Sequence, residues 1–309
     1  MHLSRVDLNL LVVFDTVLNA GGVTAASRKL NLSQPAVSHA IARLRAVFGD
    51  RLFERQGRTM VPTPFARSIA GPVRTALDTL ERTLDTAGGF DPLSSERTFR
   101  IGVRDMLERR LLPPLLTEVS RAAPHVDLVS ARLERRRLEQ DLLSGRLDLA
   151  VDVLLPMSPR VRHERLLHDR LVVVARRRHP ALRRLRGAGW DLPTYLAQEH
   201  IQVSGRRSGP GLEDMALRSL GQSRRIRLRC QSHGAACEVA SRTDLIATIP
   251  ESCAVDAVLA GAVRAQPLAV EGLALETYLY WSEAADRDPA TTWLRERLVR
   301  AASAPSGLG

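Results

Sequence analysis

The feature that most constrains the fold is a pair of closely spaced helix signals near the N-terminus. Ser33 can cap a helix that begins at Gln34-Pro35, because proline is tolerated in a first turn whose amide has no intrahelical partner. This helix is expected to end at Gly49 with one apolar face buried. Residues 25–30 before it are rich in small side chains and predict a short helix that can pack closely. Two such helices, joined by a turn at Asn31-Leu32, indicate a helix-turn-helix.

The neighbouring segments complete a winged form of this motif. Asp7 can cap a first helix, and Thr24 can cap the second. After the third helix, short strands near residues 52–55 and 59–61 flank a polar tip and predict a β-hairpin. Three helices followed by a hairpin predict a winged helix-turn-helix over residues 6–63.

A longer helix is expected directly after the hairpin, over residues 64–87. Leu77, Leu80 and Leu84 lie on one of its faces. This spacing suits self-association, although packing on a neighbouring domain would use the same stripe. We therefore expect residues 64–87 to form a linker and dimerisation helix.

The remaining 210 or so residues alternate strand and helix patterns, which places the fold in the α/β class. Such alternation predicts parallel sheets covered by helices, with one strand at 171–175. Pro113-Pro114 predicts that the first of these helices kinks or restarts. The region is long for one small sheet, so two α/β lobes with a ligand cleft between them are the economical interpretation.

The charge of the chain favours a polyanionic partner at its N-terminal end. The formal net charge is +11, but Lys29 is the only lysine among 45 basic residues, a bias that a GC-rich coding sequence would also produce. Distribution is therefore more informative than the total. Residues 1–63 hold eight basic and four acidic side chains, the highest density of net charge in the chain. The basic run at 132–137 is expected to be a solvated or subunit-facing edge.

Several function classes lack their sequence signals. The three cysteines, Cys230, Cys237 and Cys253, have neither a disulfide pattern nor zinc-ligand spacing, so we expect reduced thiols in a cytoplasmic protein without metal or cofactor. The N-terminus has the acidic Asp7 and Asp15 where a signal peptide would be cationic, and no apolar run approaches a membrane span. Motifs for zinc proteases, P-loops and serine hydrolases do not occur.

The third helix carries the residue types that read DNA. A helix fits the major groove, where Gln34 can pair with adenine and Pro35 or Ala36 can touch a thymine methyl group. Arginines on the hairpin can enter a minor groove, whose negative potential attracts them. The expected DNA contacts are Ser33, Gln34, Pro35, Ala36, Ser38, His39 and Arg43 on the helix, with Arg55 and Arg58 on the hairpin.

Residues 6–63 resemble the DNA-binding domain of LysR-type transcriptional regulators. The matching segments are residues 7–11, 24–27, 32–38, 41–44, 52–53 and 62–63. Residues 7–11 and 61–64 are similar to the branch that contains nodulation regulators and regulators of aromatic degradation. One departure is Arg45, where the family usually has an acid after the leucine.

The resemblance implies a cytoplasmic transcription factor that acts as a homodimer or homotetramer. It implies binding to interrupted palindromes in double-stranded DNA, control by a small-molecule effector, and RNA polymerase as a further partner. It also implies a periplasmic-binding-protein-like effector domain over residues 91–303, with lobe one at 98–168 plus 270–300 and lobe two at 169–269. The branch hints at an aromatic effector, although an aromatic-lined pocket is not evident from nine Phe and Tyr residues and three Trp.

In sheets of this kind, ligands bind beyond the carboxyl ends of strands. This rule selects as candidate effector contacts Asp105, Met106, Val153, Ser204, Gly205, Ser232 and His233. Three of the choices have simpler alternatives. Asp105 and His233 can each cap the helix that follows, and Ser204-Gly205 can be only a turn.

Two other functions remain open at this stage. In an enzyme, Asp105, Asp152 and His233 would form the site, but their spacing does not indicate a nucleophile and its base. An architectural DNA binder would bind without sequence preference and without response to a small molecule. A ligand-controlled regulator that catalyses no reaction accounts best for the combined motifs.

Overall fold

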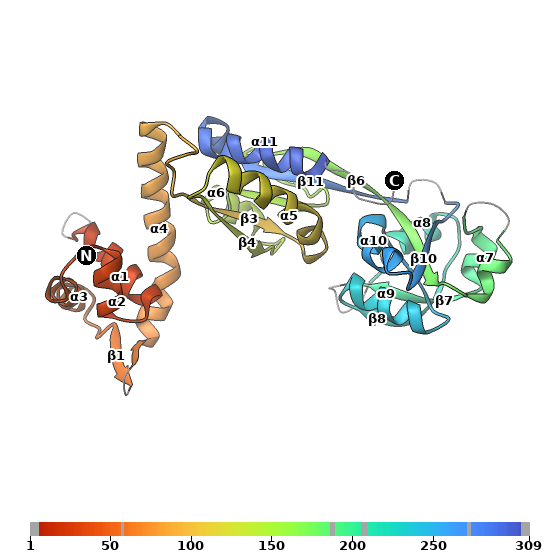
Figure 1. Cartoon of the computed structure of the whole chain (residues 1–309), viewed down its shortest axis with the longest axis horizontal. Coiled ribbons are helices and arrows are strands. Elements are labelled where there is room, and N and C mark those ends of the chain that lie inside the picture. Colours follow the sequence, from red (N-terminus) through yellow and green to blue (C-terminus); the bar gives the residue numbers. More distant parts are fainter. Residues whose placement is uncertain (1–5, 57–58, 186–188, 205–208, 271–272, 304–309) are drawn as a thin grey trace. The chain divides into compact units, whose positions relative to one another are not determined.

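The computed structural model describes residues 6–56, 59–185, 189–204, 209–270 and 273–303. The chain divides into two compact units, residues 1–90 with 144–146 and the remainder from residue 91 onward (Figure 1). Within the described ranges, no single helix is long and apolar enough to cross a membrane. The first two helices meet that test only as a sharply bent pair, and both contribute buried side chains to a core.

The first unit is a three-helix domain with a two-stranded hairpin and a long final helix. Its apolar core includes Phe14, Val37, Leu44 and Leu52. The strands pair antiparallel, with Arg55 opposite Met60. In chain order the elements are α1 (Leu8–Ala20), α2 (Val23–Lys29), α3 (Gln34–Phe48), β1 (Phe53–Gln56), β2 (Thr59–Pro62) and α4 (Pro64–Gly88).

Local capping rules account for most helix ends in this unit. The Asp7 side chain accepts the amide of Asn9 at 3.1 Å at the start of α1, which confirms the predicted cap. The predicted cap of α3 is also confirmed, because the Ala36 amide donates to Ser33 Oγ at 3.3 Å. The prediction for Thr24 is wrong: α2 already begins at Val23, so Thr24 lies inside the helix and cannot cap it.

Helix α4 is continuous over 25 residues and contains Pro72. Thr63 caps it, since Thr63 Oγ1 accepts the amide of Ala66 at 3.0 Å. The leucines on this face of α4 lie in different environments. Leu77 packs against the core of the first unit, whereas Leu80 is 44% exposed. The side chain of Leu84 lies outside the described residues.

The second unit is built on one long mixed sheet with the strand order β4-β3-β5-β11-β6-β9-β7-β8, and β10 also pairs with β6. Helices are interspersed along the chain, as the sequence pattern predicts. The elements are β3 (Thr98–Val103), α5 (Asp105–Ala122), β4 (Asp127–Arg132), α6 (Leu138–Leu143), β5 (Leu149–Asp152), β6 (Val161–Arg176), η2 (Pro180–Arg183), α7 (Leu192–Leu196), β7 (Glu199–Val203), α8 (Leu212–Ser219), β8 (Arg225–Cys230), α9 (His233–Arg242), β9 (Ile246–Pro250), α10 (Glu251–Leu259), β10 (Val263–Pro267), β11 (Ala274–Ser282), η3 (Glu283–Arg287) and α11 (Pro289–Ser303).

The sheet departs from the all-parallel arrangement that alternation predicts. Strands β3, β4 and β5 are parallel, as are β7, β8 and β9, but β6, β10 and β11 pair antiparallel. The expected strand at 171–175 is only the end of β6, which spans sixteen residues (Figure 1). Residues 161–170 of β6 pair with β11, and residues 171–176 pair with β9 and β10. One strand therefore passes through both halves of the sheet.

The proline pair does not restart the first helix of this unit. Pro113 and Pro114 both lie inside α5, which is one helix of eighteen residues. Leu107, Leu111, Leu115 and Val119 form its buried stripe. The helical spacing of these apolar residues outweighs the loss of two backbone donors.

Candidate nucleic-acid interface and ligand site

Helix α3 presents one apolar and one polar face. Val37, Ile41 and Leu44 are buried in the core of the first unit. The opposite face is exposed, and it includes every helix residue that the sequence selects for DNA contact. These exposed residues are Ser33, Gln34, Pro35, Ala36, Ser38, His39 and Arg43. Ser33 has a second task as the cap, where its oxygen accepts the Ala36 amide.

Arg43 is the one basic residue of this set, and it pairs with the N-terminus of α1. Its guanidinium lies 3.5 Å from Asp7 Oδ2, and the Arg43 side chain is 53% exposed. An ion pair this exposed contributes little to stability, because water screens both charges. Arg43 can therefore exchange Asp7 for a phosphate group at small cost.

The hairpin places Arg55 on β1, where the residue is exposed. Arg58, the second predicted hairpin contact, lies outside the described residues. The structure therefore places only one of these two arginines.

Two candidate effector segments lie at the starts of helices in the second unit. Asp105 and Met106 begin α5, where no side chain caps the helix, so capping by Asp105 is wrong. Ser232 caps α9 by accepting the Ala235 amide at 3.4 Å, so capping by His233 is wrong as well. Helix capping therefore explains neither Asp105 nor His233.

The structure brings His233 into the electrostatic neighbourhood of residues from other elements. Burial lowers the pKa of His233, and the positive charge of Arg104 lowers it further. Asp105 at the start of α5 and Asp169 in β6 act in the opposite direction. The carboxylate of Asp105 thus acts through space on His233, a sequence-selected residue that is distant along the chain.

Val153 follows a buried acid, Asp152, which the strand-end rule did not select and which the sequence suggested only for the enzyme alternative. Asp152 is fully buried and accepts two hydrogen bonds from Arg135, at 2.7 and 2.8 Å. Arg104 approaches the same carboxylate at 3.6 Å. The hydrogen bond to Asp152 raises the pKa of Arg135. Arg135 is exposed, with a side chain 43% accessible, as expected for the run at 132–137. Its guanidinium nevertheless pairs with Asp152, because a buried carboxylate requires a cationic partner.

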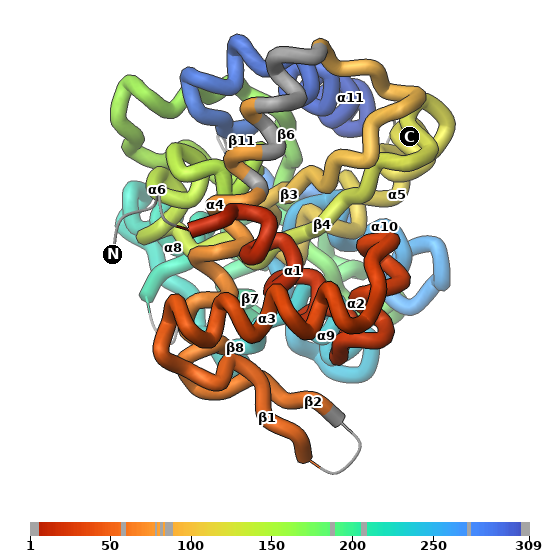
Figure 2. Tube along the Cα trace, turned by 90° about the vertical axis from the view of Figure 1, so that its left-hand side faces the viewer, coloured from red at the N-terminus to blue at the C-terminus, as the bar shows by residue number. Residues whose placement is uncertain are grey.

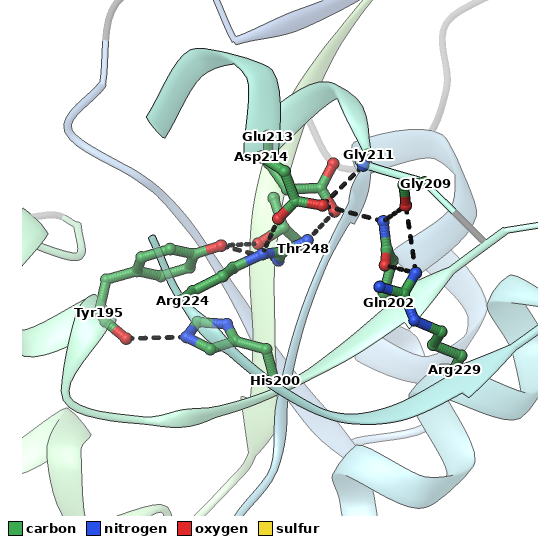
Figure 3. Close-up of polar contacts among 10 residues, drawn as sticks. All are labelled: Tyr195, His200, Gln202, Gly209, Gly211, Glu213, Asp214, Arg224, Arg229 and Thr248. Atoms are coloured by element: carbon green, nitrogen blue, oxygen red, sulfur yellow. Dashed lines mark hydrogen bonds and ion pairs between the residues drawn. The ribbon is translucent and has the colours of Figure 1, made fainter. Parts of the chain in front are cut away.

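Ser204 begins a loop whose two described ends are hydrogen-bonded, while Gly205 lies outside the described residues. The Ser204 amide donates to the carbonyl of Cys230 at 2.8 Å. At the far end, the Gly209 carbonyl accepts from Gln202 Nε2 at 3.4 Å and from Arg229 Nη1 at 3.2 Å (Figure 3). The loop is thus fixed to β7 and β8 at both ends.

A buried ionic network lies beside Gln202 and Gly211 (Figure 3). The Arg224 side chain is only 1% exposed, and it pairs with Glu213 and, at 2.6 Å, with Asp214. Asp214 also accepts the Gly211 amide at 2.6 Å. Arg224 Nη1 lies 3.0 Å from the hydroxyl of Tyr195. Glu213 is buried and Asp214 is only 15% exposed, so both carboxylates depend on this arginine, because an unpaired charge with little access to water is costly.

His200 lies beside the same network as a neutral side chain. Burial lowers its pKa to about 3, and the charge of Arg224 acts in the same direction. His200 Nε2 lies 3.1 Å from the carbonyl oxygen of Tyr195, which can only accept, so this nitrogen carries the proton. The imidazole also packs edge-on against the Tyr195 ring at 4.5 Å between centroids.

Metal and thiol chemistry find little support in the described part of the chain. Its described residues contain no cluster of three or more His, Cys, Asp and Glu side chains that could hold a metal ion. The three cysteines are free thiols. Burial raises the pKa of Cys237 to about 11 and of Cys253 to about 12, so both remain protonated at neutral pH.

Comparisons with known proteins match both units. A family described as "Bacterial regulatory helix-turn-helix protein, lysR family" matches residues 8–67, and "LysR substrate binding domain" matches residues 94–303. The transcriptional activator NagR of Ralstonia sp. is 36% identical over 97% of this chain and 98% of its own length. The activator NahR of Pseudomonas putida is 34% identical over 96% of this chain and 97% of its own.

Two solved structures superpose on nearly the whole of this chain. A probable transcriptional regulator from Pseudomonas aeruginosa superposes with a TM-score of 0.78 at 35% identity, covering 96% of this chain and 97% of that one. Full-length CbnR in complex with its target DNA superposes with a TM-score of 0.63 over 96% of this chain and 100% of its own. Its identity is 17%, so that likeness concerns the fold alone.

Proposed function

This chain belongs to the LysR family of transcriptional regulators, and we propose that it reads its operator with the exposed face of α3 and the hairpin β1–β2. Proteins of this family are oligomeric, bind DNA and respond to small-molecule effectors. The chain is accordingly a DNA-binding regulator with an effector-binding domain, and not an enzyme.

One observation carries the assignment of the DNA-contacting residues: the polar face of α3 is exposed along its whole length. In this proposal Gln34, Ser38 and His39 contact base edges, Pro35 and Ala36 touch thymine methyl groups, and the remaining polar side chains hold the backbone. Ser33 and Arg43 on α3 contact the phosphate backbone. Arg55 and Arg58 on the hairpin enter a minor groove.

The proposed effector site lies between lobe one, residues 98–168 plus 270–300, and lobe two, residues 169–269. The electrostatic influence of Asp105 on His233 supports it, since these residues come from different lobes. Its contacts would be Asp105, Met106, Val153, Ser204, Gly205, Ser232 and His233. The similarity to nodulation and aromatic-degradation regulators favours an aromatic effector.

The proposed assembly is a homodimer, or a homotetramer made of two dimers, joined through the linker helix at residues 64–87. A two-fold dimer presents two copies of α3, so its operator would be an interrupted palindrome. RNA polymerase is the proposed further partner, and the cytoplasm is the proposed location.

A footprinting experiment on the intergenic DNA beside the gene tests this proposal. The full-length protein should protect a site with dyad symmetry, and an effector should change the extent of protection or the bending of the DNA. Absence of any protected dyad upstream of the neighbouring operons would contradict it. Deleting residues 64–87 should abolish the dimer, and a dimer that survives the deletion would move the interface elsewhere.

A further inference from the structure

Arg45 connects the recognition helix to the start of the hairpin. It lies in the last turn of α3, and its side chain is hydrogen-bonded to the segment that leads into β1. Figure 2 shows the backbone of α3 and of the hairpin β1–β2. Arg45 Nε donates to the carbonyl of Arg51 at 2.7 Å, and Arg45 Nη2 donates to the carbonyl of Phe53 at 3.4 Å. A single guanidinium therefore holds two carbonyl groups on either side of Leu52.

The segment that Arg45 holds has a strained backbone. Leu52 has a φ of +59°, a left-handed conformation that costs a non-glycine residue of this size about 1–2 kcal/mol. Its side chain is fully buried in the core of the first unit. Such a conformation persists only where the surrounding contacts determine it. The contacts around Leu52 thus decide the direction in which the hairpin leaves the domain.

A second set of hydrogen bonds holds the same segment from the side of α4. Asp50 Oδ1 accepts the Leu52 amide at 2.6 Å and the Thr63 hydroxyl at 2.7 Å. The Thr63 amide in turn donates to the Leu52 carbonyl at 2.9 Å. Asp50 therefore fixes the base of the hairpin to the start of α4, whereas Arg45 fixes it to α3. Arg45 provides the direct polar connection from the recognition helix.

The chemistry of this connection requires a donor. Both partners of Arg45 are carbonyl oxygens, which can only accept, so an acidic side chain at position 45 could not make either bond. A lysine would keep the charge, but its compact ammonium group cannot reproduce the two separated donors of a planar guanidinium. Arg45 thus makes contacts that an acid at this position could not make.

We infer that Arg45 is a positioning residue for DNA binding: it fixes the hairpin relative to α3, so that Arg55 meets the DNA while α3 occupies the groove. This inference rests on the proposed roles of α3 and the hairpin. Arg45 acts through the hairpin arginines and does not itself contact DNA. Removing Arg45 should therefore cost affinity only as long as one of these arginines is present.

A double-mutant cycle tests this inference directly. The full-length protein, Arg45→Ala, Arg55→Ala and the double variant, all carrying Arg58→Ala so that Arg55 is the one hairpin arginine left from the proposed contacts, are titrated with a fluorescent random-sequence duplex at several salt concentrations. We expect Arg45→Ala and Arg55→Ala each to weaken binding about three- to tenfold. The double variant should bind as Arg55→Ala alone does, because the position of an absent arginine no longer matters. All variants are compared at a temperature at which circular dichroism shows them folded.

Arg45→Lys is the matched control, because it keeps the charge and removes the forked donor. We expect this variant to lose most of the affinity that Arg45→Ala loses. A direct phosphate contact by Arg45 would instead leave Arg45→Lys near the unsubstituted protein. It would also make the two alanine effects multiply and lower the salt slope by about 0.9 for each lost contact.

The outcomes separate this inference from the proposed function. If the losses of affinity in the two alanine variants multiply, or if Arg45→Lys binds DNA as the unsubstituted protein does, the positioning role is overturned and the hairpin contact stands. An Arg55→Ala variant with unchanged affinity would overturn the hairpin contact itself, and the positioning role would fall with it.

Discussion

The polar residues of the two units are used in opposite ways. On α3 they lie on an exposed face, and the ion pair of Arg43 with Asp7 is open to water. Around Arg224 in the second unit they are largely buried and satisfy one another, with its guanidinium between two carboxylates. A surface that must read an external polymer keeps its donors and acceptors accessible. Charges that join elements of one domain can lie inside it, because they are paired with one another.

This comparison predicts that the largest loss of stability follows from breaking the buried network. Arg224→Met should lower the free energy of unfolding by about 3–5 kcal/mol, because the buried Glu213 and the largely covered Asp214 lose their cation. The neighbouring Arg225→Met is the control. Its side chain is 69% exposed and pairs with Glu199, so its loss should cost at most about 1 kcal/mol. Equal losses in urea denaturation would remove the distinction between the two regions.

The second prediction concerns pH and His200. The folded pKa of about 3 lies below the ordinary value of 6.5, so the unfolded chain binds the extra proton first as the pH falls. The neutral His200 therefore does not reduce stability above about pH 6.5. As the pH falls from 6.5 toward 3, the free energy of unfolding decreases, and the decrease is about 2 kcal/mol at pH 5. Denaturation curves of the protein and of His200→Gln should diverge in their pH dependence. Parallel curves from pH 7 to pH 5 would contradict a buried neutral imidazole.

A smaller effect is expected where α3 uses its own surface residue for stability. Ser33→Ala removes the cap on the Ala36 amide and should cost about 1 kcal/mol in thermal unfolding. Ser33→Asp keeps an acceptor at the cap and should restore most of that loss. If Ser33→Ala and Ser33→Asp melt alike, the cap does not stabilise the helix.

The smallest effect on stability is expected from the rest of the α3 face. Ser38→Ala and His39→Ala should change the free energy of unfolding by no more than about 0.5 kcal/mol, because both residues are exposed. A loss comparable to that of Arg224→Met would show that these side chains are needed for folding, and the contrast between the units would fail.

How far the sequence predicts the structure depends on how local each cause is. The caps at Asp7 and Ser33 follow from a few adjacent residues, and both predictions are confirmed. The prediction for Thr24 fails because α2 begins two residues earlier than that cap implies, a difference that a capping rule cannot resolve. The sequence does not predict the first part of β6, because its largely exposed, charged residues show no apolar alternation. Pairing with β11 makes this segment a strand.

Long-range partners set the limit for the candidate site. The buried Asp152 signals a need for a cation, but Arg135 lies seventeen residues earlier, within a basic run that resembles solvated surface. The contacts of Arg224 with Tyr195 and Glu213 join three segments that only the fold brings together. Arg45 was visible in the sequence as a departure, yet its two carbonyl partners depend on the unusual backbone at Leu52.

The central claim is that the outward face of α3 reads base sequence, and a ratio of affinities tests it most directly. Gln34→Ala, Ser38→Ala and His39→Ala are titrated with the footprinted operator and with a random duplex of equal length at the same salt concentration. Each lost base contact should weaken operator binding by about tenfold, and binding to random DNA should hardly change. An equal loss on both duplexes would place these side chains on the phosphate backbone and contradict the claim.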